Sequence, residues 1–207
     1  DHFYSDININ NIDLHITPNG FHYGNIIYPA SSNMPPLYIL QPWLADYTAQ
    51  EVKRVSGNVS YYNGADFVYG PLSDDYSKDY GKTYYRTWKI SRAETLNHIH
   101  NWYKPTYIIP ESILNWPSQK TTYHGRQYAG ADYIDANENA IYDPENGDYP
   151  KISGDEAVLY IVNDGRYQNR GEGNPLDSLN VDIYALIYAF NRPETAYFNN
   201  TFLLIIK

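Results

Sequence analysis

The chain has 207 residues, no cysteine, and a formal charge of −9 from 15 basic and 24 acidic residues. This length and a 43% share of hydrophobic residues are enough for a folded core. The acidic balance argues against nucleic acid or anionic membrane as a partner, because both need clustered Lys and Arg. The lack of cysteine excludes disulfides, thiolate metal sites and cysteine nucleophiles, and no apolar run is long enough for membrane insertion.

Tyrosine dominates the apolar composition, with 24 copies beside 4 tryptophans and a single methionine. Its ring packs well on half-buried strand surfaces while its hydroxyl stays in water. We therefore expect a mainly β fold, a β-sandwich-like domain with one or two short helices and long ordered loops.

The first part of the chain indicates strands and loops. Alternating apolar residues around a Pro-Asn-Gly turn predict a hairpin over 8–28. The apolar run 37–45 predicts a strand buried on both faces, because Pro42 would break a helix. Residues 51–62 predict a further strand, and the Gly-, Asp- and Ser-rich stretch 63–82 is interpreted as a long surface loop.

The middle of the chain carries the clearest helix signal. An S-x-x-E capping box opens a predicted helix over 91–103, and a second helical turn is predicted over 111–116 between two prolines. The apolar stripe of the longer helix follows at helical spacing: Leu96, Ile99 and Tyr103.

The last part of the chain holds two long apolar runs, 156–164 and 181–190, which predict central strands. The chain then ends in TFLLIIK, an apolar strand with no turn or polar cap after it. We expect residues 1–207 to form a single β-rich domain, or the start of one, in a longer multidomain protein.

The stretch 135–150, DANENAIYDPENGDYP, has the ligand spacing of a calcium loop. Ca²⁺ takes about six to eight hard oxygen ligands, and alternate residues of a tight loop can turn their side-chain oxygens inward. The expected ligands are the side chains of Asp135, Asn137, Asn139, Asp143 and Asp148 and the backbone carbonyl of Ile141.

Two features of the same stretch favour a plain polar turn. Ala140 stands where a sharp calcium-loop turn needs glycine, and two of the first three expected ligands, Asn137 and Asn139, are neutral amides. Asn146 stands where an EF-hand has its bidentate Glu, so the stretch is not an EF-hand. An alanine held at positive φ costs on the order of 1 kcal/mol. The alternative is a loop of Asx turns whose side chains bond their own backbone, and the sequence leaves both interpretations open.

Other side chains with possible chemistry give weaker signals. His98 and His100 lie two apart on the predicted helix and so point to different faces, which favours packing or exposure over metal binding. Carboxylates such as Asp74, Asp155 and Asp164 leave a glycosidase-type pair open, since such a pair is defined in space. The motifs of nucleophile-elbow hydrolases, P-loop proteins and zinc proteases are absent, so we expect no enzymatic activity.

Aromatic residues flank the stretch 63–82. They are suited either to stacking on sugar rings or to cross-strand packing, and packing is the favoured interpretation. These residues are Tyr61, Tyr62, Phe67, Tyr69, Tyr84, Tyr85 and Trp88.

The segment IDANENAIYDPENGDYPKISGDEAVLYIVND, together with RTWKISRAETLNHIHNW before it, resembles the N-terminal region of large Bacteroidetes surface proteins. Many of these proteins are exported by the type 9 secretion system with a C-terminal sorting domain. The resemblance spans nearly the whole chain. Family loops read D-x-N-G-N-G-x-Y-D-P, whereas Glu138 and Ala140 replace both glycines here.

The resemblance implies an extracellular or cell-surface protein whose signal peptide has been removed before Asp1. It implies a non-enzymatic module for adhesion or assembly of a surface structure, and we combine this with a loop stabilised by Ca²⁺. The expected partners are other domains of the same protein, other surface proteins, or glycans. The alternative function is a carbohydrate-binding module or glycoside hydrolase, and Asp177-Ser178-Leu179 resembles a short O-glycosylation signal.

Overall fold

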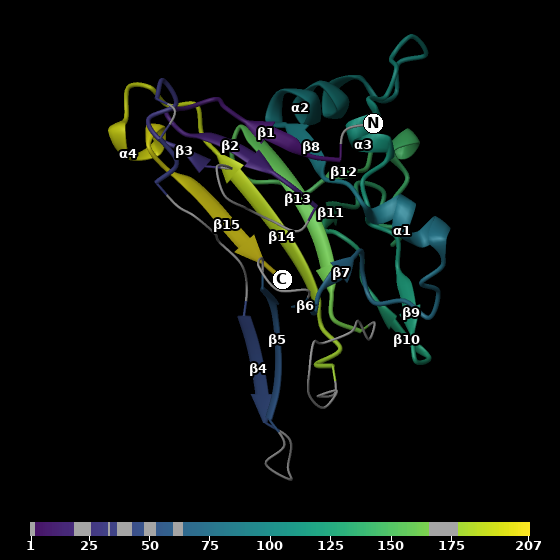
Figure 1. The fold of residues 1–207 in the computed structure, drawn as a ribbon. Helices are drawn as coiled ribbons and strands as arrows, with labels where there is room; N and C mark the ends of the chain where they lie inside the picture. Colours follow the sequence, from purple (N-terminus) through teal and green to yellow (C-terminus); the bar gives the residue numbers. More distant parts are fainter. Residues whose placement is uncertain are drawn as a thin grey trace.

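The computed structural model describes residues 3–18, 26–32, 34–36, 43–47, 53–59, 64–165 and 178–207. At its centre lies a five-stranded antiparallel sheet in which β15, β14, β13 and β7 follow in order and β8 also pairs with β13 (Figure 1). The strands are β7 (Val68–Tyr69), β8 (Trp88–Ser91), β13 (Glu156–Asn163), β14 (Asp182–Ala189) and β15 (Phe202–Ile206). The prediction of a mainly β fold is confirmed.

A second, smaller sheet covers one face of the central sheet. It consists of β1 (Ser5–Ile7), β2 (Asp13–Ile16) and β3 (Ile26–Ile27), paired in that order. Its buried aliphatic residues pack against alternate residues of β13 and β14, as expected for two sheets that share a core. The main contributors from β13 are Val158, Tyr160 and Val162.

Helices and loops cover the opposite face. The helices are α2 (Arg92–Asn101) and α3 (Glu111–Leu114), and Ile113 and Trp116 pack there against Trp88 and Ile90 of β8. Residues Ala157, Leu159 and Ile161 of β13 enter this second core. Because successive side chains of a strand point to opposite faces, β13 and β14 supply both cores.

The remaining elements are short and lie around this centre. These elements are β4 (Trp43–Tyr47), β5 (Lys53–Val59), β6 (Gly64–Ala65), α1 (Lys78–Tyr84), β9 (Thr121–Tyr123), β10 (Arg126–Tyr128), β11 (Tyr133–Ile134), the 3₁₀ turn η1 (Pro144–Asn146), β12 (Tyr149–Pro150) and α4 (Ala196–Asn199). Among the described residues, no helix is long and apolar enough to span a membrane.

Several predicted strands are confirmed. The runs 156–164 and 181–190 form β13 and β14, the two long central strands. The predicted hairpin over 8–28 corresponds to the antiparallel pair β2–β3, although residues 19–25 lie outside the described part. Residues 51–62 contain β5.

The predicted strand over 37–45 is described only at its end, since residues 37–42 lie outside the described part and β4 begins at Trp43. β4 pairs with β5 in a ribbon that projects from the rest of the fold (Figure 1). Leu44 is half-buried and Ala45 is exposed, so this end of the run is not buried on both faces as predicted. An apolar run of strand length does not specify whether one or both faces are covered.

The stretch 63–82 is not a continuous loop, because it contains β6, β7 and most of α1. The Ser77 hydroxyl accepts a hydrogen bond from the Tyr80 backbone N–H and caps α1. The rings of Tyr76, Tyr80 and Tyr84 contact one another in sequence, the first pair edge to face and the second tilted, with centroids 5.2 and 4.7 Å apart. The signal that sequence reasoning missed is this serine cap followed by tyrosines four residues apart.

Helix α2 has the predicted capping box, in which the side chains of Ser91 and Glu94 each bond the other's backbone N–H. Its buried face was predicted wrongly, since Thr95 and His98 are buried whereas Leu96 and Tyr103 are exposed. The histidine expectation is confirmed: His98 packs beside the Tyr107 ring, and His100 on another face is exposed. Tertiary contact with the acidic loop 135–148 decides which face of α2 is buried.

Two acidic side chains lie where β13 ends and β14 begins. The Asp164 carboxylate is almost fully buried and accepts hydrogen bonds from the Ser56 hydroxyl and from the N–H groups of Leu179 and Val181. Nearby, Asp182 accepts the Leu72 N–H. Burial and the charge of Asp164 raise the pKa of Asp182 to about 6, against the opposing effect of that hydrogen bond.

This raised pKa predicts a pH-dependent stability. An unfolded Asp has a pKa of about 3.9, so between about pH 4 and pH 6 the unfolded chain loses the proton that folded Asp182 keeps, and stability falls as pH rises. Asp182→Asn should abolish this component and raise the free energy of unfolding at pH 7 by about 1 to 2 kcal/mol, allowing for partial solvent screening. Urea unfolding across this pH range measures the difference.

The matched control is Asp79→Asn, which removes an exposed carboxylate on α1. Its unfolding free energy should follow the pH dependence of the unchanged protein. Parallel curves for Asp182→Asn and the unchanged protein would contradict the assignment.

Candidate cation-binding loop

The two-stranded sheet β11–β12 brings the ends of the acidic loop together. Tyr133 pairs with Pro150 and Ile134 with Tyr149, so residues 135–148 close this antiparallel pair as one loop. The 3₁₀ turn η1 lies within the loop and ends at Gly147, whose φ of 102° suits glycine. All the predicted ligands therefore lie within a single closed segment.

Asp148 fastens the two halves of the loop. Its side chain is fully buried and accepts the N–H groups of Ala136, at 2.8 Å, and of Asp143, at 3.1 Å. Burial raises the pKa of Asp148, and the nearby charge of Asp143 adds to this effect while the N–H donors oppose it. Asp148 thus has a structural role whether or not it also binds a cation.

Asp143 is the point on which the amide side chains converge. Its carboxylate accepts hydrogen bonds from the amide nitrogens of Asn146, at 2.8 Å, and of Asn137 and Asn139, both at 3.0 Å. These donors, Asn146 first, lower the pKa of Asp143. The carboxylate is therefore held in its charged form near the surface.

Asp135 organises the first turn of the loop. Its two oxygens accept the N–H groups of Asn139, at 3.1 Å, and Ala140, at 2.7 Å. The side-chain amide oxygens of Asn137 and Asn139 accept hydrogen bonds from the backbone N–H groups two residues further on, those of Asn139 and Ile141. These are the Asx turns of the alternative interpretation.

The structure thus brings five predicted side chains into one network: Asp135, Asn137, Asn139, Asp143 and Asp148. Ile141 contributes its N–H to the network, and its side chain is 65% exposed. In the described part of the chain, no three acidic or imidazole groups are gathered as a metal ion would need. The donor chemistry nevertheless suits a hard cation, because carboxylate and amide oxygens are the ligands that Ca²⁺ takes.

The backbone of the loop adopts the conformation expected of the glycine-rich family pattern. Glu138 and Ala140 have φ of 59° and 63°, in the left-handed region that favours glycine. These are the two positions at which the family loops carry glycine. The expectation that Ala140 is held at positive φ is confirmed.

Residues far from the loop in sequence hold it against the helices. The Trp102 ring, at the end of α2, lies so close to Gly147 that an added Cβ would stand 3.0 Å from it. The Tyr142 hydroxyl donates to the Ile113 carbonyl at 2.6 Å. The His98 side chain of α2 is fully buried. Burial lowers the pKa of His98, and the backbone carbonyls of Asp148 and Pro144 in the loop oppose this shift.

The other sequence candidates lie apart. Asp74 accepts the His124 N–H, Asp155 pairs with Arg192 at 2.7 Å, and Asp164 is buried beside Ser56. Each of these carboxylates therefore has its own structural contact.

The aromatic candidates divide between the core and the surface. Phe67 and Trp88 are buried, Tyr69 and Tyr84 are half-buried, and Tyr85 is 40% exposed. Tyr61, Tyr62 and Asp177 lie outside the described residues.

Comparison with known proteins assigns no family to this arrangement. No protein-family model, curated protein or solved structure matches the chain. Function is therefore inferred from the residues and the fold.

Glycine at position 140 should stabilise the protein. Ala140→Gly removes the Cβ that disfavours the left-handed conformation, a relief of about 1 to 2 kcal/mol, and adds about 0.5 to 1 kcal/mol of flexibility to the unfolded chain. The free energy of unfolding should therefore rise by up to about 1 kcal/mol. Glu138→Gly should act in the same direction and also removes a negative charge, so Ala140→Gly is the cleaner variant. Urea unfolding gives both values.

The matched control is Ala136→Gly in the same loop, because Ala136 has no positive φ. That change should lower stability by about 0.5 to 1 kcal/mol through the greater flexibility of the unfolded chain. A stabilising Ala136→Gly together with a destabilising Ala140→Gly would contradict this account of the loop backbone.

Proposed function

We propose that this chain is a non-enzymatic module of an extracellular Bacteroidetes surface or secreted protein, in adhesion or assembly of a surface structure, with Ca²⁺ held in the 135–148 loop. The observation that carries the cation proposal is the convergence of five oxygen-bearing side chains on one loop whose backbone has glycine-like turns at Glu138 and Ala140. The resemblance of the sequence to type 9 secretion substrates supports the location.

The residues that would hold the cation are Asp135, Asn137, Asn139, Asp143 and Asp148, with the carbonyl of Ile141. Both Asn side chains now turn their amide nitrogens toward Asp143. Half a rotation of each amide would present its oxygen instead, since amide nitrogen and oxygen have nearly the same shape. The same rotation would break the hydrogen bonds that these oxygens accept from the N–H groups of Asn139 and Ile141. When bound, a divalent cation would supply positive charge that offsets the repulsion between the Asp143 and Asp148 carboxylates.

The ligand set favours weak binding. Two of the side chains are neutral amides, and Asp148 is already engaged by two backbone N–H groups. Extracellular Ca²⁺ modules bind with dissociation constants of about 10⁻⁴ to 10⁻³ M. Such an affinity suits a protein that works outside the cell.

Thermal unfolding in EDTA against about 10 mM Ca²⁺ tests the cation. A site with the expected affinity should stabilise the folded chain by about 1 to 3 kcal/mol, seen as a higher midpoint in Ca²⁺. Asp135→Asn and Asp143→Asn should reduce or abolish the response, whereas Asp79→Asn on α1 should retain it. An unchanged midpoint for the unmodified protein would remove Ca²⁺ from the proposal.

The surface location has its own test. An antibody raised against the purified chain should label intact cells of the source organism, or detect the protein in their medium. Signal found only after the cells are opened would contradict export, whatever the outcome with Ca²⁺.

A further inference from the structure

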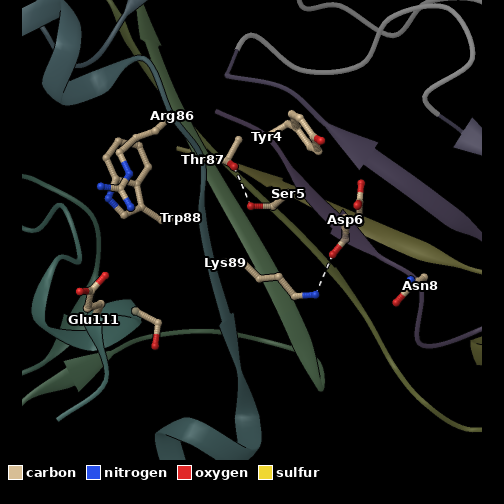
Figure 2. Close-up of a pocket in the computed structure, with 10 residues that line it drawn as sticks. Tyr4, Ser5, Asp6, Asn8, Arg86, Thr87, Trp88, Lys89 and Glu111 are labelled. Atoms are coloured by element: carbon tan, nitrogen blue, oxygen red, sulfur yellow. Dashed lines mark hydrogen bonds between the residues drawn. The ribbon is translucent and has the colours of Figure 1, made fainter. Parts of the chain in front are cut away.

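A groove runs along the free edge of β8. It has a volume of about 560 Å³ and lies between β1 on one side and α3 on the other (Figure 2). β8 pairs with β13 along its other edge. The groove is thus formed where the two layers that cover the central sheet meet its border, and its size lies within the usual range for ligand sites.

Alternate side chains of residues 86–89, at the start of β8 and just before it, face the two sides of the groove. Thr87 and Lys89 point toward β1, where the Thr87 and Ser5 hydroxyls share a 2.7 Å hydrogen bond and Lys89 donates to the Asp6 carbonyl at 2.8 Å. Arg86 and Trp88 point the opposite way, toward Glu111 (Figure 2). Polar groups from three distant segments therefore meet at one strand edge.

An exposed aromatic ring, that of Tyr4, lines this groove and is 46% exposed. Two further exposed aromatic residues, Phe3 and Tyr85, are next to lining residues in the sequence and are 48% and 40% exposed. Each ring is supported by a neighbour: Phe3 lies 5.0 Å from Tyr85, and Tyr4 lies 4.2 Å from His15, centroid to centroid. The rings are thus held in place while part of their surface stays open.

Three polar side chains of the lining are not used by the fold. Within the described part of the chain, the side chains of Asn8, Arg86 and Glu111 make neither hydrogen bonds nor ion pairs. The Arg86 guanidinium lies over the Trp88 ring at 5.7 Å, which orients it without neutralising its charge. Lys89, in contrast, is paired with Glu156 at 3.0 Å.

We propose that this groove binds an oligosaccharide that carries a carboxylate, such as a uronic acid oligomer. Sugar rings present apolar C–H faces, which suit the exposed aromatic rings, and hydroxyl groups, which suit the free Asn8 and Glu111 side chains. The guanidinium of Arg86 matches a carboxylate with two parallel hydrogen bonds. The net charge of −9 does not preclude an acidic ligand, because charges beyond about 8 Å are largely screened at physiological salt.

An extended peptide added to the edge of β8 is the competing occupant. Strand addition needs a free row of backbone groups with room for a chain about 4.8 Å away. Here the Ser5–Thr87 and Lys89–Asp6 hydrogen bonds cross from β8 to β1 and obstruct that path. A sugar that rests on side chains is therefore favoured over a peptide.

Calorimetric titration of the purified protein tests the proposal independently of the cation and of the cell-surface location. The probes are short oligomers of galacturonate, glucuronate and mannuronate, and the matched neutral oligomers of galactose, glucose and mannose. At least one acidic oligomer should bind, about tenfold or more tightly than its neutral counterpart. The same titration in EDTA should give the same result.

Variants locate the site. Arg86→Gln should weaken binding about 10- to 100-fold, and Arg86→Lys less, because lysine keeps the charge without the paired geometry. Tyr4→Ala should weaken it about three- to tenfold. The controls Arg126→Gln and Tyr103→Ala, which change an exposed arginine and an exposed tyrosine outside the groove, should leave affinity unchanged.

Unfolding midpoints of all variants show whether they fold, and Arg86→Lys keeps the test valid if Arg86→Gln does not. The proposal is overturned if none of the acidic oligomers binds, if the neutral oligomers bind as well as the acidic ones, or if the Arg86 variants bind normally. An extended acidic peptide that binds in place of the sugars would also overturn it and identify the groove as a strand-addition site.

Discussion

Strand β13 has side chains in the core on each of its faces and backbone partners along each of its edges. Seven of its eight residues are buried, so both faces of the central sheet must be covered before the strand can be stable. Complete burial of a large aliphatic side chain contributes about 1.5 to 3 kcal/mol. The β1–β2–β3 sheet on one side and the helices on the other are the two covers that this requirement imposes.

The sequence predicts the parts of the fold that depend on this burial. The long apolar runs that form β13 and β14 need burial on both faces, which only the centre of a covered sheet provides. The Ser91–Glu94 capping box determines the start of α2 through local hydrogen bonds. The buried face of α2 could not be predicted, because His98 faces the acidic loop, which lies almost fifty residues further along the chain. Helix α1 was not predicted because the residues that pack it are tyrosines spaced among polar residues, without an aliphatic stripe.

The acidic loop shows the same division. Its Asx turns and the positive φ of Ala140 follow from the local sequence, and both appear in the structure. Its support by Trp102 and by the Tyr142–Ile113 hydrogen bond depends on tertiary placement, which no local pattern specifies. The groove at β8 is further from local prediction, since its lining joins residues around 5, 87 and 111, and only the fold makes them neighbours.

The β1 side of that groove is joined to β8 by side chains and by one lysine-to-carbonyl bond, in place of a ladder of backbone hydrogen bonds. Most residues of this wall can therefore change without breaking the backbone pairing of the central sheet, which β13 maintains from its own side. Substitutions at Tyr4 and Asn8 would therefore change the rim of the groove and leave the pairing of β8 with β13 intact.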